Sequence, residues 1–354
     1  MTAIDLVVLN YNGRRLLEEC LPSVTEAAQT SRHVCRVAVI DNGSSDDSLA
    51  FLSSAYPRVR QFRSSNRGLC SYNDVLARLD SRVVVLLNND IKLSPSSIDP
   101  LVAPLLVDSR CFMTAPLCWL FDGQTYEGLQ TAIRWRWGLV QAISDYPGYE
   151  RVMGTACLTA SAGAVMAVDR ERFSELGGFD PLYLPGRLED LDFAFRAYMA
   201  GYHARYVPAA VAYHEGEATF RKELGTERST ALALRNTLLF HWKNLRHPWH
   251  LLRHTAALPA RFALDCLRAP FVRGGQRFRF SKAYIEALAR WRQHDAAGCL
   301  PKRSWRRERA FIAGFDWRQF AAAERRGLAE SSARRAATQG SDENLLCGVA
   351  GGAN

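Results

Sequence analysis

Short apolar runs alternate with polar turns and amphipathic stretches along the first quarter of the chain. Strand-like runs cover residues 4–9, 34–40, 59–62 and 83–87. Between them, residues 14–28, 47–56 and 71–79 carry apolar side chains three or four positions apart, as in a helix packed on one face. Repetition of strand, loop and helix predicts an α/β fold with a parallel sheet and crossover helices.

The pattern changes in the rest of the chain. Residues 91–150 are irregular and rich in aromatic side chains, which predicts mixed loops and short strands, and residues 154–168 are small and apolar, which suggests a second buried layer. A helix is expected over residues 189–200, closed by Gly201, and a strand over 202–212 that ends near His214. Beyond residue 221 the pattern is helical and basic, and residues 328–354 are predicted to be a disordered tail.

Charge is distributed unevenly along the chain. Of 45 Lys and Arg and 36 Asp and Glu, residues 221–354 hold 25 and 11, a net charge of +14, which leaves 20 and 25, a net charge of −5, for residues 1–220. An acidic half suits cation and phosphate chemistry, whereas a basic half suits an anionic surface such as lipid headgroups, polyphosphate or nucleic acid. No nucleic-acid recognition module is present, so we expect no nucleic-acid partner.

Residues 235–252 interleave aromatic side chains with cations, a pattern suited to the interface of an anionic membrane; the alternative is a helical subdomain whose cations face water. The nine cysteines form no CxxC pair and indicate reduced thiols in a cytosolic protein. No apolar run reaches about 18 residues and no signal peptide precedes the first strand. We therefore expect a cytoplasmic protein, peripheral on the inner face of the cell membrane.

Four predicted loops are rich in Asn, Asp and Gly, and they should share the carboxyl edge of one sheet: residues 10–13, 41–46, 66–68 and 88–90. Asp41 can accept hydrogen bonds from a base or a ribose hydroxyl, and Asp90 can hold a divalent cation. A nucleotide diphosphate fits between them. Taken alone, the last run suits equally an Asx-rich turn that ends its strand.

The order and spacing of these loops resemble family 2 glycosyltransferases with the GT-A fold, in particular their bacterial, rhamnosyltransferase-like type. The resemblance covers about residues 4–240. It rests on residues 9–13, 40–46, 66–73 and 86–90 and, in the acceptor half, on Gly177-Gly178-Phe179-Asp180, Glu189-Asp190-Leu191-Asp192, Gly201-Tyr202 and residues 208–214. It implies a Rossmann-like three-layer α/β/α sandwich, here with a C-terminal basic helical extension.

Carried over residue by residue, the resemblance implies a nucleotide-sugar site in which Asp41 contacts the nucleobase, formed by Asn10, Tyr11, Asn12, Asp41, Asn42, Asn66, Gly68, Asn73, Asn88 and Asn89. Asp90 and His214 would hold Mg²⁺ or Mn²⁺. Where many relatives have Asp-x-Asp, this chain has Asn88-Asn89-Asp90, so one carboxylate stands in place of two.

The implied reaction transfers a sugar from a nucleotide-diphosphate donor to an acceptor hydroxyl with inversion. Asp190 is the expected general base, Glu189 is the close second, and Asp192 is a structural or capping acid. The acceptor would be a glycan or a lipid-linked molecule in polysaccharide or glycolipid biosynthesis.

The expected organisation has three parts. Residues 1–220 form the catalytic domain, divided into a nucleotide-sugar half (1–92) and an acceptor half (93–220). Residues 221–327 form the basic helical extension with a membrane-surface contact, and residues 328–354 form the tail.

Two other functions remain as alternatives. A nucleotidyltransferase that makes nucleotide sugars should carry a Gly-rich N-terminal loop with Arg and Lys, which residues 10–13 do not supply. A non-catalytic sugar-nucleotide binding protein should lack part of the acidic cluster. Residues 130–135 resemble the Gln-x-x-Arg-Trp motif of processive synthases, but they contain one residue too many and precede Glu189 and Asp190, so we do not expect processive synthesis.

Overall fold

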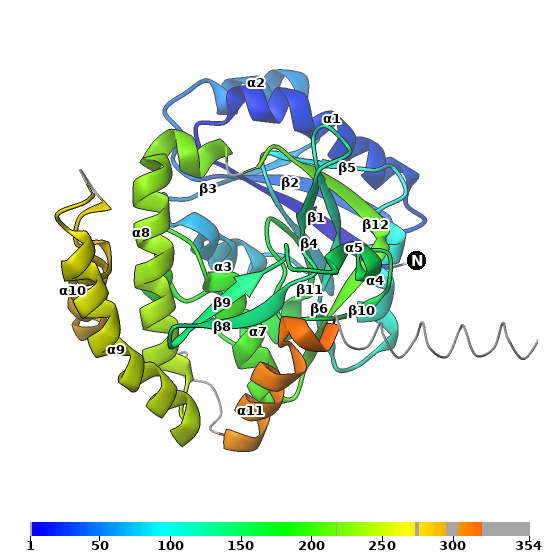
Figure 1. Ribbon diagram of the computed structural model, residues 1–354. Helices are drawn as coiled ribbons and strands as arrows, with labels where there is room; N and C mark the ends of the chain where they lie inside the picture. Colours follow the sequence, from blue (N-terminus) through cyan, green and yellow to red (C-terminus); the bar gives the residue numbers. More distant parts are fainter. Residues whose placement is uncertain (1, 217, 273–275, 295–303, 321–354) are drawn as a thin grey trace, which may run out of the picture.

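The computed structural model describes residues 2–216, 218–272, 276–294 and 304–320, and the tail predicted for residues 328–354 lies outside this range. One large mixed sheet runs through the molecule in the order β10-β12-β6-β11-β4-β1-β2-β3 (Figure 1). β5 pairs with β12, β7 pairs with β6, and β8 and β9 form a separate hairpin. The strands are β1 (Ala3–Asn10), β2 (Val34–Asp41), β3 (Arg60–Arg63), β4 (Val83–Asn88), β5 (Ile91–Leu93), β6 (Cys111–Leu120), β7 (Tyr126–Gly128), β8 (Ala132–Arg136), β9 (Leu139–Ile143), β10 (Cys157–Thr159), β11 (Val165–Asp169) and β12 (His203–His214).

The first four strands confirm the predicted parallel arrangement. β1 pairs in parallel with both β2 and β4, and β2 pairs in parallel with β3. The chain therefore adds strands outward from β1 through β2 to β3, and then returns past β1 to place β4 on its other side. This reversal of strand order is the place where open α/β sheets bind ligands, just beyond the carboxyl ends of the strands.

The acceptor half differs from the sequence prediction in two ways. Residues 154–168 do not form a second layer, because β11 lies in the same sheet, antiparallel to β4 and β6, with all its residues buried. The sequence pattern does not distinguish the two cases, because a strand covered on both faces of one sheet and a strand in a separate layer both give a short apolar run. Residues 91–150 contain a ten-residue helix, α4 (Ile98–Val107), and a ten-residue strand, β6.

Helices cover both faces of the sheet. α1 (Arg14–Thr30), α2 (Ser48–Ala55) and α4 lie on one side, where Ser31 at the end of α1 donates a hydrogen bond to Asp99 of α4 (2.6 Å). On the other side are the 3-10 turn η1 (Gly68–Cys70), α3 (Ser71–Leu76), α6 (Arg170–Glu175) and α7 (Glu189–Ala200), with the Phe173 and Phe193 rings of α6 and α7 in contact. The short elements α5 (Tyr149–Val152) and η2 (Pro181–Tyr183) lie in connecting loops.

Most of the described residues beyond 217 are helical, and these helices pack on the catalytic part through a second apolar core. They are α8 (Ala218–Asn244), which bends at Gly225, α9 (Pro248–Arg268), α10 (Arg279–Arg292) and α11 (Trp305–Gly314). Leu238 and Phe240 of α8 and Phe311 of α11 join Phe195 of α7 and the β8–β9 hairpin in this core.

The second core corrects the interpretation of residues 235–252. In the first part of this range, Leu238, Phe240, His241 and Lys243 are buried, so these side chains face protein and not a membrane. The sequence alone did not decide between the two, because cations alternate with aromatic residues both in a helix at a membrane interface and in a packed helix whose cations pair with buried acids. Exposed side chains begin again at Pro248 and Trp249.

Candidate active site

The carboxyl ends of β1, β2 and β4 bring three of the predicted loops together. The Asn89 amide donates to the Asn10 side chain (2.9 Å), and the Asn10 amide in turn donates to Asp41 (3.4 Å). All three side chains are buried, and the Asn42 backbone N–H donates to the Asn10 carbonyl (2.8 Å). Local sequence produces this edge because each residue follows an apolar strand directly.

The loops after β1 and β2 are also tied to each other. The Asn12 backbone N–H donates to the Ser44 hydroxyl (2.9 Å), the Ser45 N–H donates to the Asn12 side chain (2.7 Å), and the Ser44 N–H donates to Asp41 (3.1 Å). Tyr11 lies half-buried between these contacts. The Asp41 carboxylate is therefore held by neighbouring hydrogen-bond donors at the carboxyl edge of the sheet.

The loop at residues 66–68, which follows β3, approaches the acceptor half closely. The Asn42 amide donates to the Gly68 carbonyl (3.3 Å) and lies 3.5 Å from the Asn66 side-chain oxygen. Gly68 has a φ of +51°, and a Cβ there would lie 2.6 Å from the Pro185 carbonyl oxygen. Only glycine suits this position, since both the dihedral angle and the contact exclude a side chain.

Asn73 lies apart from this edge. Its amide donates to the Phe179 carbonyl (2.8 Å) and its oxygen accepts from the Phe179 N–H (2.9 Å), so the whole amide group is used. The contact fixes the Gly177-Gly178-Phe179-Asp180 loop against α3. Binding of a nucleotide sugar by Asn73, which the sequence suggested, stays a prediction.

Asp90 and His214, the two residues expected to hold a metal, lie next to each other in the structure. The His214 Nε2 atom lies 3.3 Å from Asp90 Oδ2, and its Nδ1 atom lies 2.7 Å from a carboxylate that sequence reasoning missed, Glu127 of β7. Burial opposes protonation of His214, but hydrogen bonds to Asp90 and Glu127 outweigh it and raise the pKa of His214 to about 10. A metal bound there must displace this proton.

The surrounding oxygens fit a divalent cation. Asp90 Oδ1 and Glu127 Oε2 are buried without a hydrogen-bond partner, which is costly unless a cation or a donor binds them. Glu215 Oε2 is also buried without a partner, while the other oxygen of this carboxylate pairs with Arg15 (2.5 Å). Within the described residues, no group of three or more His, Cys, Asp or Glu side chains is already arranged as a metal cage. Mg²⁺ and Mn²⁺ often take only one or two protein carboxylates together with substrate phosphates, so the donors present suffice.

Glu189 and Asp190 begin α7 and are bound differently. Asp190 Oδ2 accepts a hydrogen bond from the Ser161 hydroxyl (2.8 Å), whereas Glu189 Oε2 is buried without a partner. Burial, followed by the charge of Asp190, raises the pKa of Glu189 to about 8. Burial also raises the pKa of Asp190, against the hydrogen bond from Ser161.

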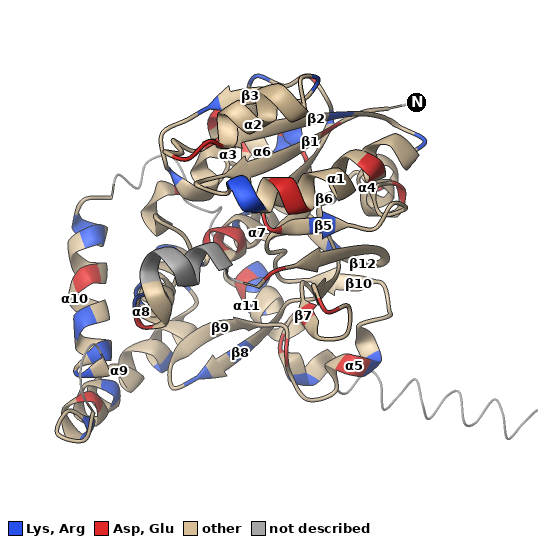
Figure 2. Ribbon diagram, turned by 90° about the horizontal axis from the view of Figure 1, so that it is seen from above, with Lys and Arg blue, Asp and Glu red and all other residues tan. Residues whose placement is uncertain are grey.

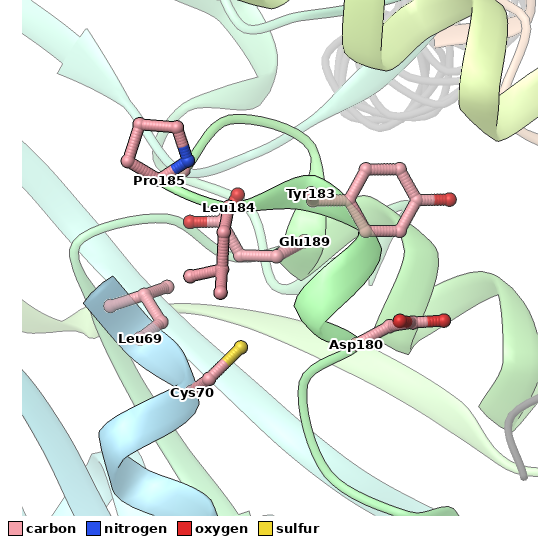
Figure 3. A pocket seen from close by; sticks show the side chains of 8 residues that line it. Leu69, Cys70, Asp180, Tyr183, Leu184, Pro185 and Glu189 are labelled. Carbon is pink, nitrogen blue, oxygen red and sulfur yellow. The ribbon is translucent and has the colours of Figure 1, made fainter. Parts of the chain in front are cut away.

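Glu189 also lines a small cavity between η1 and the loop that leads into α7. Figure 3 shows its carboxyl group among Leu69, Leu184 and Pro185. We call the strand ends that carry Asn10, Asp41 and Asn89 the donor edge. Ser161, which binds Asp190, lies three residues before Ala164, whose carbonyl accepts a hydrogen bond from the Asn88 backbone N–H at that edge (3.0 Å).

Asp192 has the structural role that was expected, with partners that the sequence did not indicate. It binds the Lys243 ammonium of α8 (2.8 Å) and Arg196 (2.8 Å), and Lys243 also binds Asp180 (2.6 Å). Although burial opposes ionisation, Lys243 and Arg196 hold the pKa of Asp192 at about 2. The Lys243 side chain is 0% exposed, so this network lies in the interior.

The order and direction of the strands define the class of fold, which is GT-A. Two solved structures share the fold. They are GalNAc-T7 with UDP, GalNAc and Mn²⁺ (TM-score 0.55, 20% identity, 83% of this chain and 58% of that one) and residues 1–349 of S. aureus TarS with UDP-GlcNAc (TM-score 0.50, 13% identity, 81% of each chain).

Sequence comparison identifies the family. A model of "Glycosyl transferase family 2" matches residues 5–138, and one of "Glycosyl transferase family group 2" matches residues 143–270. The chain belongs to glycosyltransferase family 2.

Two curated relatives match over similar stretches. The N-acetylglucosaminyl-diphospho-decaprenol L-rhamnosyltransferase of Mycobacterium tuberculosis is 28% identical over 244 residues, which are 62% of this chain and 78% of the relative. The human N-acetylgalactosaminyltransferase 7 is 24% identical over 60% of this chain, but the match spans only 36% of that protein. None of the described helices is long and apolar enough to span a membrane.

Proposed function

We propose that this glycosyltransferase moves a sugar from a nucleotide-diphosphate donor to an acceptor hydroxyl with inversion of the anomeric centre. The observation that carries the proposal is the link from the donor edge to the acid pair: Asn88 binds Ala164, and Ser161 in the same short segment binds Asp190. A donor at the edge and a base beside it are what a single displacement requires.

The donor would lie across the ends of β1, β2 and β4. Asp41 would accept hydrogen bonds from the nucleobase, and the backbone of residues 10–12 would line the same pocket. Asn42, Asn66 and Gly68 would form its far side, a role supported by their mutual contacts.

Asp190 would act as the general base. The carboxyl groups of Glu189, which is buried, and Asp190, which is half-buried, raise each other's cost of ionisation, so one of them keeps a proton at neutral pH. The raised pKa of Glu189 makes it the protonated partner, which leaves Asp190 as the carboxylate that accepts the proton of the attacking hydroxyl. The Ser161 hydroxyl would hold Asp190 in position.

Asp90 and His214 would hold Mg²⁺ or Mn²⁺, with Glu127 and Glu215 beside them. Bound there, the cation offsets negative charge on the departing diphosphate. The relation between His214 and Glu127 resembles the usual support of a metal-bound imidazole, in which a carboxylate accepts from the second ring nitrogen.

We further propose a lipid-linked glycan as the acceptor, because the mycobacterial relative is named for a decaprenol-linked one. A location on the cytoplasmic side of the membrane agrees with the free thiols of the described cysteines. The acceptor would then be presented at an anionic membrane surface.

The test is release of nucleoside diphosphate from a panel of UDP-, dTDP- and GDP-sugars, with and without a chelator. We expect metal-dependent release with one donor class and loss of release in Asp190→Asn. Release of pyrophosphate from a nucleoside triphosphate would instead favour the nucleotidyltransferase. Donor binding without turnover under any condition would favour the non-catalytic binding protein.

A further inference from the structure

The outward face of α9 carries an unusual stripe of apolar side chains. Trp249, Leu252 and Leu267 are 58%, 56% and 70% exposed, and Ala256 and Ala260 between them are exposed as well. At about 3.6 residues per turn these five positions fall on one side of the helix. The opposite side packs inward through His250, His254 and Phe262.

Exposed aromatic residues also lie just beyond both ends of the helix. Phe271 follows its last turn and is 86% exposed, and Trp305 lies beside His247, just before its first turn (ring centroids 6.3 Å apart), and is 58% exposed. Single exposed apolar residues are ordinary, but a continuous helical stripe with aromatic ends marks an interaction surface.

Cations outnumber acids around the stripe. Arg253 and Arg268 are exposed on α9, and Figure 2 shows further cations along α9 and α10, where Glu286 is an exposed acid. The acid of α9, Asp265, is turned inward and accepts hydrogen bonds from Ser281 at the start of α10 (2.8 and 2.9 Å). Glu308, close to the first turn of α9, is buried against His250 (2.7 Å).

A protein partner with an acidic rim would also match this charge, but it would need a groove or a shaped counterpart, whereas the stripe lies along one convex helix. An amphipathic helix with exposed Trp and Leu and flanking arginines has the composition of a helix that lies in the plane of a lipid bilayer interface. Arg and Trp in such helices meet the headgroups while the aliphatic side chains enter the acyl boundary.

We propose that this surface, Trp249, Leu252 and Leu267 with Phe271 and Trp305, binds the surface of an anionic lipid bilayer. The inference rests on the proposed function, since a lipid-linked acceptor would have to reach the site from that bilayer.

Contacts connect the surface to the acid pair. α9 follows α8 directly, and α8 holds the loop before Glu189: the Asn236 amide donates to the carbonyls of Tyr183 and Gly186 (2.8 Å each), and Arg235 donates to the carbonyl of Leu184 (2.6 Å). The helix that lies on the bilayer would thus be joined to the loop that lines the cavity beside Glu189.

The experiment is sedimentation of the full chain with vesicles of phosphatidylcholine alone or mixed with phosphatidylglycerol. We expect binding to the anionic vesicles, weaker binding at high salt, and at least a tenfold loss of binding in a combined Trp249→Ser, Leu252→Ser, Leu267→Ser variant. Ile285→Ser is the matched control, because Ile285 of α10 is 66% exposed outside the stripe and its replacement should leave binding unchanged.

Several results would overturn the proposal: no sedimentation of the wild type, equal binding to neutral vesicles, or full binding by the triple variant. A dimer in sedimentation velocity that the triple variant abolishes, without any vesicle binding, would assign the stripe to contact between copies. Release of nucleoside diphosphate without an added acceptor should be the same in wild type and triple variant. Failure of the proposed function would therefore be seen in turnover, independently of the vesicles.

Discussion

Replacing Asp190 with Asn and Glu189 with Gln separates the roles of two neighbouring acids. The structure gives them different states: Asp190 is held by Ser161, and Glu189, with a pKa of about 8, keeps its proton at pH 7. Gln resembles a protonated Glu, so Glu189→Gln should retain most of the activity at pH 7. Asn cannot accept the proton of the acceptor hydroxyl, so Asp190→Asn should lower kcat by about 10²–10⁴-fold, or roughly 3–5 kcal/mol in the barrier, with little change in KM.

The pH dependence provides the second measurement. The wild-type rate should show an ionisation near pH 8 that Glu189→Gln lacks, because the amide does not titrate. Stability should follow the same group: the unfolded chain releases the Glu189 proton near the ordinary pKa of 4.5, while the folded chain keeps it to about pH 8, so the free energy of unfolding falls as pH rises between these values. Glu189→Gln should flatten that slope.

The assay is nucleoside-diphosphate release across pH 5–9, with urea unfolding in the same buffers. The reasoning is refuted if Glu189→Gln loses as much kcat at pH 7 as Asp190→Asn does. It is also refuted if both variants keep the wild-type pH profile.

Other predictions concern groups that hold the site. Lys243→Met should lower the free energy of unfolding by about 3–5 kcal/mol, because it removes the cation that the buried Asp180 and Asp192 share, whereas Lys282→Met on the exposed side of α10 should change it by less than about 0.5 kcal/mol in urea unfolding. Gly68→Ala should cost about 1–3 kcal/mol, more than Gly148→Ala, because Gly148 also has a positive φ (+91°) but open space around it; equal losses of thermal stability would contradict the contact with Pro185. Asp90→Asn should weaken Mn²⁺ binding at least tenfold in a titration followed by electron paramagnetic resonance without any nucleotide sugar, and unchanged binding would remove Asp90 from the metal site.

The donor edge could be predicted because its signals are local. Each apolar run is short enough to be a buried strand, and the polar residues after it must lie at the same edge once the strands are parallel. Asn10, Asp41 and Asn89 therefore meet in the structure as neighbouring strand ends do. Nothing more than strand order was needed to bring them together.

The partners across the sheet gave no such signal. Glu127 contacts His214 although 87 positions separate them, and it comes from a three-residue strand in the irregular segment. The helix α4 was missed because Pro100 and Pro104 interrupt its pattern, even though Ile98, Leu101 and Leu105 have helical spacing and are buried. Glu215, directly after His214, is the one missed acid that adjacency could have suggested.

Lys243 shows why charge patterns in the basic half were ambiguous. A lysine among aromatic residues suits a membrane interface, and the acids that neutralise it, Asp180 and Asp192, lie more than 50 residues earlier in the chain. Only tertiary structure decides between a solvated cation and a buried one. The apolar stripe of α9 shows the reverse ambiguity. Its spacing would also suit a helix packed against protein, but in the structure the stripe is exposed.

The buried network also bears on where the catalytic unit ends. Domain boundaries fall where few contacts cross, yet Lys243 and Asn244 of α8 bind Asp192 of α7, and Asn236 holds the loop before Glu189. Asp192 lies only two residues after Asp190 on the same helix, so a cation from α8 neutralises the acid next to the proposed base. We infer that the boundary expected at residue 220 does not separate two units. A fragment ending there would keep the donor edge but leave Asp180 and Asp192 without Lys243, and the start of α7 would lose the support that positions Glu189 and Asp190.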